Sequence, residues 1–155
     1  LGGWGGFNFD FVGTWLEKLE VQSLPEEVAA GFPVAKCVGF HTDETCGEVP
    51  VPEWRHKFRT TWQTPIHLDV SATWRFFGAT DSAVATSDFP EVHYLDLAAR
   101  YQLFDNLALR AGVNNILDRD PPFTEVGAGF GNGNTYPQFY DATGRFFFFS
   151  ATVDF

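Results

Sequence analysis

The sequence predicts an all-β protein whose antiparallel strands form a segment of a transmembrane β-barrel. Its composition favours strands, with 18 Phe, 5 Trp and 4 Tyr but no Met. Apolar and polar residues alternate with period two over six stretches, and short connections alternate with long ones. No window approaches the roughly 18 to 20 consecutive apolar residues of a membrane-spanning helix. A helical membrane protein is therefore excluded.

The first strand is expected over residues 7–15, with a continuation to about residue 21. Its aromatic residues occupy one parity and face away from Asn8, Asp10 and Thr14. The second strand, residues 54–62, places Trp54, His56, Phe58, Thr60 and Trp62 on one face. Arg55, Lys57, Arg59 and Thr61 fall on the other. Each stretch therefore predicts a strand with one apolar and one polar face.

The third strand, residues 66–77, follows a short connection at Gln63, Thr64 and Pro65 and has the clearest alternation. The fourth and fifth strands, residues 94–104 and 107–114, are separated only by Asp105 and Asn106, a pair suited to a tight turn. The sixth is expected over residues 145–155.

The connections predict which edge of the sheet faces which side of a membrane. Residues 23–52, 78–92 and 118–144 are long, and all fall on one edge if the strands are sequential antiparallel neighbours. Long loops on one edge and short turns on the other are typical of outer-membrane barrels. Trp54 and Trp62 lie roughly 20 Å apart in height for strands tilted by about 40°. Trp15, Trp54, Trp62 and Trp74 are therefore expected in two aromatic girdles.

The charged residues exclude one class of partner and indicate a polar interior. A formal net charge of −10 is unsuited to nucleic-acid binding. No nucleophile elbow, paired catalytic carboxylates or phosphate-binding glycine loop occurs, so neither an enzyme nor a cofactor is expected. Six basic residues are expected on the inward face of the barrel, facing its lumen: Arg55, Lys57, Arg59, Arg75, Arg100 and Arg110.

The longest connection contains both cysteines, Cys37 and Cys46, whose proximity suits a disulfide in an oxidising compartment. The competing interpretation is a metal site that joins them to His41, Asp43 and Glu44. The four histidines have no metal-binding spacing, and we expect them to be solvated or lumen-facing polar residues.

Two stretches near the C-terminus resemble one family. Residues 111–122 read Ala-Gly-Val-Asn-Asn-Ile-Leu-Asp-Arg-Asp-Pro-Pro, and residues 134–145 read Asn-Thr-Tyr-Pro-Gln-Phe-Tyr-Asp-Ala-Thr-Gly-Arg. Together with the terminal Phe155, they resemble the C-terminal end of TonB-dependent receptors, entering and leaving the last extracellular loop. Residues 52–59 and the paired-cysteine loop before them are also similar to this family.

The resemblance implies that residues 1–155 are the C-terminal part of a barrel of about 22 strands and supply about six of them. The plug domain and remaining strands are then absent from this chain. The implied activity is active uptake of a ferric siderophore or another scarce nutrient across the Gram-negative outer membrane. The implied partners are outer-membrane lipid, the small-molecule nutrient, and the TonB energy-coupling complex acting through the missing plug. The six inward basic residues would contact that plug.

The last strand also resembles the signal by which the barrel-assembly machinery recognises its substrates, because its free edge is suited to β-augmentation. The residues concerned are Phe147, Phe149, Ala151, Val153 and Phe155. Simple contact with lipid explains the same pattern, and the two interpretations are compatible. Two other classes remain open: a passive porin or barrel enzyme, and a soluble β-sandwich binding module.

Overall fold

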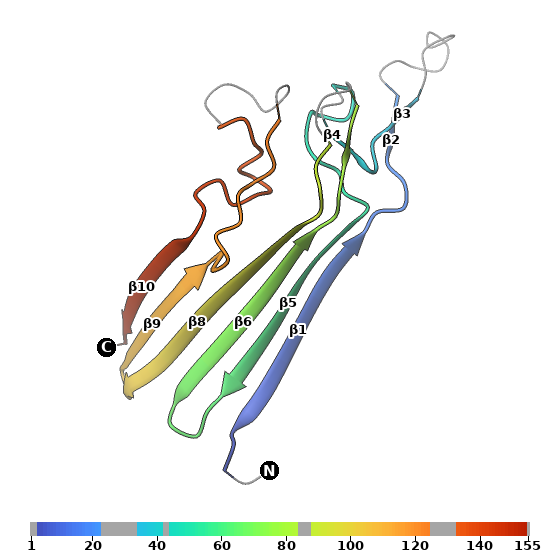
Figure 1. Cartoon of the computed structure of the whole chain (residues 1–155). Coiled ribbons are helices and arrows are strands. Elements are labelled where there is room, and N and C mark those ends of the chain that lie inside the picture. Colours follow the sequence, from blue (N-terminus) through green and yellow to red (C-terminus); the bar gives the residue numbers. More distant parts are fainter. Residues whose placement is uncertain (1–2, 23–33, 42–43, 84–87, 125–132, 155) are drawn as a thin grey trace.

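The computed structural model describes residues 3–22, 34–41, 44–83, 88–124 and 133–154. Its main feature is one six-stranded sheet in the order β1-β5-β6-β8-β9-β10, in which all neighbours are antiparallel (Figure 1). The strands are β1 (Gly6–Trp15), β5 (Trp54–Gln63), β6 (Leu68–Phe77), β8 (Val92–Phe104), β9 (Leu107–Asn114) and β10 (Phe146–Val153). The all-β, antiparallel prediction is confirmed. In the described part of the chain the sheet is open, with β1 and β10 at its edges.

The pairing register gives the sheet one apolar face. A single row of paired residues crosses all six strands, and every member belongs to the parity predicted to be apolar. The row is Phe9, Thr60, Ala72, Leu97, Val113 and Phe147. We call the side of the sheet that carries this row the apolar face, and the opposite side the polar face.

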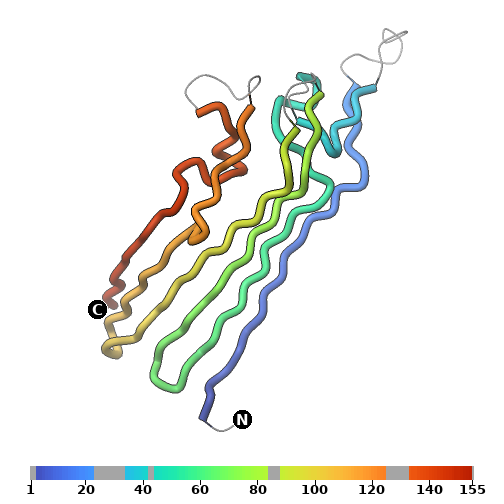
Figure 2. The backbone as a smooth tube through the Cα atoms, viewed as in Figure 1, coloured from blue at the N-terminus to red at the C-terminus, as the bar shows by residue number. Residues whose placement is uncertain are grey.

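The connections divide between the two edges of the sheet as expected. The β5–β6 and β8–β9 turns lie at one edge, with both ends of the chain (Figures 1 and 2). The three long connections rise from the other edge. They carry two small sheets, the antiparallel pair β2 (Glu20–Val21) and β3 (Ala35–Lys36), and the parallel pair β4 (Phe40–His41) and β7 (Asp81–Ser82).

Several predicted boundaries are wrong by a few residues. Ile66 belongs to the β5–β6 turn rather than to a strand, because the chain reverses through His67, whose φ is 61°. The first strand ends at Trp15 and does not continue to residue 21, since β2 pairs separately with β3. A register shift between Gln102 and Phe104 places Phe104, rather than Leu103, opposite Leu107.

The described hydrophobic core lies where the long connections meet the adjoining ends of β6 and β8, not across the middle of the sheet. Its buried members are Phe89, Val92, Tyr94, Tyr136 and Tyr140, with Phe77 and Phe139 packed against them. The side chains on the apolar face of the sheet are much more exposed than those of this core: Phe9 is 64% exposed and Phe149 is 70% exposed. Within the described ranges, no second sheet of comparable size packs on this face, as a β-sandwich requires. Among those same residues, no helix is long and apolar enough to cross a membrane.

Candidate functional site

The six basic residues predicted to point inward share the polar face. The register pairs Lys57 with Arg75 and Arg100 with Arg110, and Arg55 and Arg59 have the same parity on β5 as Lys57. They make up six of the ten lysines and arginines of an acidic chain. The polar face is therefore locally basic although the chain carries a net charge of −10.

Arg75 is the most heavily paired of these residues. Its Nε donates to Oδ2 of Asp96 at 2.8 Å, and its Nη1 donates to Oδ1 of Asp141 at 2.9 Å. Its guanidinium also lies 4.8 Å from the centre of the Tyr94 ring, within the range of a cation–π interaction. The Tyr94 hydroxyl accepts the backbone N–H of Asp141 at 3.2 Å. Arg75 therefore connects strands β6 and β8 to the last loop.

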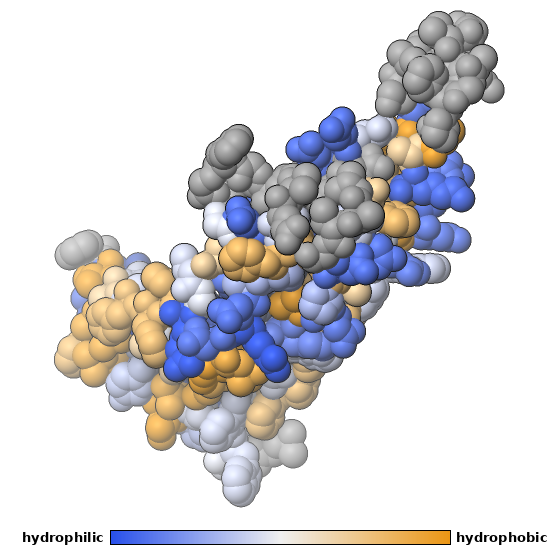
Figure 3. All heavy atoms as spheres, turned by 45° about the horizontal axis from the view of Figure 1, so that its top comes forward, coloured by the Kyte–Doolittle hydropathy of each residue, from blue (hydrophilic) through white to orange (hydrophobic). Residues whose placement is uncertain are grey.

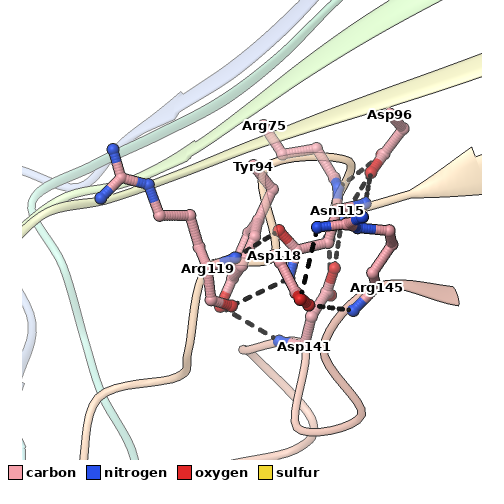
Figure 4. Close-up of polar contacts among 8 residues, drawn as sticks. All are labelled: Arg75, Tyr94, Asp96, Asn115, Asp118, Arg119, Asp141 and Arg145. Carbon is pink, nitrogen blue, oxygen red and sulfur yellow. Dashed lines mark hydrogen bonds and ion pairs between the residues drawn. The ribbon is translucent and has the colours of Figure 1, made fainter.

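Asn115 and Asp118 complete this network, which we call the loop clasp (Figure 4). Asn115 is fully buried, and its side chain donates to the Arg119 carbonyl at 2.8 Å and accepts the Arg119 N–H at 2.9 Å. The Asn115 N–H donates to Oδ1 of Asp96 at 2.9 Å. Asp118 accepts the Arg145 N–H at 2.9 Å. The clasp closes both the turn after β9 and the return into β10.

The loop clasp brings together the two stretches that carry the sequence resemblance. Asn115, Asp118 and Arg119 come from the first stretch, and Asp141 and Arg145 from the second. Gly144 in the second stretch has a φ of 67°, and a Cβ there would lie 3.1 Å from Oδ1 of Asp118. A glycine is therefore favoured both by the backbone conformation and by the close approach of the carboxylate.

The remaining cations of the polar face differ in their pairing. Nη1 of Arg100 lies 4.0 Å from Oδ2 of Asp69. In the described part of the chain, Arg55, Lys57, Arg59 and Arg110 form no ion pair. Two adjoining grooves of about 200 and 180 Å³ lie on this face, and residues shared by both include Arg59, Ser71, Ala98 and Arg110.

The long connections contact one another through aromatic and polar side chains. His41, only 1% exposed, stacks on Phe89 with ring centres 4.0 Å apart, and its Nδ1 lies 3.1 Å from Oγ1 of Thr80. Phe89 in turn contacts the edges of Tyr136 and Tyr140. Burial raises the pKa of both tyrosine hydroxyls, so they stay neutral well above physiological pH. All three loops thus share one packed cluster.

Cys37 and Cys46 form a disulfide, with their Cα atoms 5.6 Å apart. Both sulfurs are therefore unavailable as thiolate ligands, which removes the competing metal site with His41 and Glu44. Asp43, the other residue of that interpretation, lies outside the described residues. Over the described ranges, no group of three or more His, Cys, Asp or Glu side chains is placed to hold a metal ion.

The expectation of a solvated or lumen-facing side chain is wrong for His41, which is buried among the loops. His56 and His93 lie on the apolar face, in register with Phe76 between them, and His93 is exposed. The Trp54 indole N–H donates to Nδ1 of His56 at 2.9 Å, and that of Trp74 donates to Nδ1 of His93 at 3.1 Å. An indole partner allows each imidazole to lie on an apolar face, because one ring nitrogen is satisfied within the sheet.

The remaining predicted site residues fall on the apolar face. Trp15 pairs with Trp54 next to the long connections, Trp62 pairs with Phe7 next to the short turns, and Trp74 lies between Phe58 and Leu95. On β10, Phe147, Phe149, Ala151 and Val153 pair with the apolar residues of β9. Phe155 lies outside the described residues.

Sequence reasoning missed the carboxylates and the tyrosine of the loop clasp. Asp96 was visible as a polar-face residue, and Asp141 stands within the second resemblance stretch. Neither position indicates Arg75 as its partner, because Arg75 and Asp141 are 66 residues apart in sequence. The one signal in the sequence is the position of Asp96 in the alternation of its strand, which assigns it to the polar face together with Arg75.

Comparison with known proteins gives one informative likeness. No protein-family model and no curated protein matches the chain. Among solved structures, it is similar to a mutant of the ferric enterobactin receptor PfeA of Pseudomonas aeruginosa, with 25% sequence identity and a TM-score of 0.51. The match covers 67% of this chain and 16% of that receptor. The chain thus spans about a sixth of the receptor's length, and its fold is that of an open, antiparallel section of a receptor barrel.

Proposed function

We propose that this chain forms part of the barrel wall of a TonB-dependent outer-membrane receptor that actively takes up a ferric siderophore or another scarce nutrient. The observation that carries the proposal is the six-stranded sheet with one continuous apolar face and one polar face. The likeness to the ferric enterobactin receptor supports the same conclusion.

The apolar face fits contact with outer-membrane lipid. Its large side chains are exposed in the described structure, and each gains roughly 1.5 to 3 kcal/mol when it leaves water for an apolar environment. The backbone of a membrane-spanning sheet must also be paired at both edges, so a barrel has to close. Six strands are fewer than the roughly eight of the smallest common barrel. Further strands must therefore complete the wall beside β1 and β10.

The orientation follows from the connections. Short turns face the periplasm in outer-membrane barrels, and long loops face the exterior. The three long connections, with their disulfide and shared aromatic cluster, then form the extracellular surface that meets the nutrient. Figure 3, in which this edge is turned forward, shows hydrophilic side chains over much of it and hydrophobic side chains along the sheet.

The polar face would line the lumen, where the six basic residues meet the plug domain that couples the receptor to TonB. Trp15, Trp54 and Trp62 would form the girdles at the two lipid interfaces, because indole rings prefer that depth. Trp74, expected in the same girdles, pairs with Phe58 and would lie nearer the middle of the sheet. Phe147, Phe149, Ala151 and Val153 would serve as part of the assembly signal. The proposal involves no cofactor and no catalytic step.

A passive porin is the second candidate, because a two-faced sheet suits any outer-membrane barrel. The loop clasp favours the receptor, since it joins the two stretches that resemble TonB-dependent receptors. Uptake measurements separate the two candidates: a receptor takes up its nutrient only while the inner-membrane energy source is intact, whereas a porin does not depend on it.

The test uses the full-length protein that contains this chain, expressed in a Gram-negative host. We expect it in the outer-membrane fraction, with a mobility in detergent gels that changes on boiling, and we expect it to support energy-dependent uptake of a ferric siderophore. Recovery in the soluble fraction would overturn the membrane assignment. Outer-membrane location with energy-independent uptake would support the porin instead.

A further inference from the structure

The polar face contains a shallow cradle with a floor of small residues. One row of paired positions crosses β5, β6, β8 and β9 through Thr61, Ser71, Ala98 and Gly112. Ser71 is buried, and its hydroxyl lies 3.4 Å from the Ala98 carbonyl. Gly112 has no room for a side chain, because a Cβ there would lie 2.6 Å from the Leu97 carbonyl oxygen and 2.5 Å from Cζ of Phe148, whose ring covers it. The open floor is therefore made of Thr61, Ser71 and Ala98.

Arginines stand on both sides of this floor. On β5, Arg59 lies two residues before Thr61, on the side of the long connections. On β9, Arg110 lies two residues before Gly112, on the side of the short turns. Both line the two adjoining grooves of about 200 and 180 Å³. Lys57 and Arg75 extend the second groove, which Asp96 also lines, and Arg100 extends the first, which Asp69 also lines.

Two of these cations, Arg59 and Arg110, form no ion pair with a described carboxylate. Nε of Arg59 is buried without a hydrogen-bond partner in the described structure, even though Asp10 stands directly opposite Arg59 in the register. The Arg110 guanidinium lies over the Phe148 ring, 5.2 Å from its centre, and pairs with no described carboxylate. By contrast, Arg75 has two carboxylate partners and Arg100 has Asp69. A buried guanidinium N–H without an acceptor is costly. Because Nε of Arg59 is itself buried, an anion in the grooves would meet Arg59 through its two terminal nitrogens.

We propose that the cradle between Arg59 and Arg110 is an oxyanion-binding site that accepts carboxylate or phosphate groups. Guanidinium groups bind these planar or tetrahedral anions through several parallel hydrogen bonds. The two grooves share Arg59, Ser71, Ala98 and Arg110 in their linings, so the site suits a solute with two or more anionic groups. The anion is either such a solute passing along the lumen or a carboxylate of the same polypeptide outside the described residues. The inference rests on the proposed function only for the assignment of the polar face to the lumen.

The test measures citrate binding by isothermal titration calorimetry to the full-length protein, purified in detergent from the outer membrane. The variants are Arg59→Gln and Arg110→Gln. Arg55→Gln is the matched control, because it removes one charge from the same face of β5 without lining the two grooves. Thermal unfolding of the same four proteins is recorded in parallel.

If a free solute uses the site, the wild type binds citrate, and each cradle variant weakens binding by about tenfold or more. Arg55→Gln changes it by less than about twofold. If a carboxylate of the polypeptide fills the site, citrate does not bind, but each cradle variant unfolds at a lower temperature than Arg55→Gln, and Arg59→Lys recovers part of the loss.

Two results would overturn the oxyanion site. One is equal weakening of citrate binding by all three variants, which would indicate only the general field of the polar face. The other is no citrate binding together with equal unfolding temperatures. Either result, obtained with protein recovered from the outer membrane, leaves the proposed uptake function standing. Absence of the protein from that membrane would instead contradict the proposed function.

Discussion

Consecutive threonines on β5 provide a matched test of which face of the sheet meets lipid. Thr60 pairs with Ala72 and Phe9 on the apolar face, whereas Thr61 pairs with Ser71 on the polar face. Replacing either threonine by arginine adds the same side chain to the same strand. Only Thr60→Arg places the charge against lipid.

The expected size of the effect follows from the position of Thr60 along the strand. Thr60 lies midway between Phe58, near the centre of β5, and Trp62 at its short-turn end. An arginine on the lipid face of a barrel costs roughly 2 to 4 kcal/mol at the bilayer midplane and about 0 to 1 kcal/mol near the interface. Thr60→Arg should therefore cost about 2 kcal/mol, and Thr61→Arg less than about 1 kcal/mol because its side chain stays on the polar face, away from lipid.

The assay is reversible unfolding of the full-length protein from lipid vesicles by guanidinium, followed by tryptophan fluorescence, with the boiled and unboiled gel mobilities as a second readout. A difference of about 2 kcal/mol is about a 30-fold change in the folding equilibrium constant. If Thr61→Arg is as destabilising as Thr60→Arg, the two faces do not differ in their contact with lipid, and the assignment of the apolar face to the membrane is wrong.

Three further predictions concern the long connections. Cys37→Ser should destabilise the first loop by at most about 3 kcal/mol and leave the sheet intact, measured as faster loop proteolysis on whole cells with unchanged gel mobility. Asp141→Asn removes one of the two carboxylates of Arg75 and should weaken the loop clasp by about 2 kcal/mol, so hydrogen exchange should accelerate after β9 but not in β5. Burial raises the pKa of Tyr140, so its contribution to loop packing is complete below about pH 10 and is lost as the pH rises above it; Tyr140→Phe should reduce this alkaline loss in near-ultraviolet circular dichroism. An alkaline transition identical in the wild type and Tyr140→Phe would contradict the last of these.

The strands were predictable because each repeats its pattern over many residues. Period two assigns every side chain of β5 to a face, and the short Asp105-Asn106 turn makes β8 and β9 antiparallel neighbours. The errors fall where the local pattern and the backbone disagree. Ile66 continues the alternation of β6, yet it is 66% exposed in the turn, because the chain must reverse before the ladder begins. The register shift after Gln102 is likewise invisible to a rule of strict alternation.

The loop clasp and the histidine environments depend on contacts between distant segments. Asp141 meets Arg75 only because the last loop folds back over the edge of the sheet, a path that no local pattern encodes. Period two places His56 on the apolar face of β5, where its imidazole needs a hydrogen-bond partner. It tolerates the apolar face because Trp54, two residues earlier on the same strand, donates a hydrogen bond to it.

The most direct test of the account is the accessibility of nitroxide labels on four consecutive residues of β5 in the full-length protein reconstituted in lipid bilayers. Single cysteines replace Phe58, Arg59, Thr60 and Thr61, and collisions with oxygen are compared with collisions with a polar nickel reagent. The account predicts high oxygen accessibility at positions 58 and 60 and low accessibility at 59 and 61. Uniform values, or oxygen accessibility at 59 and 61 instead, would contradict a barrel wall whose apolar face meets lipid.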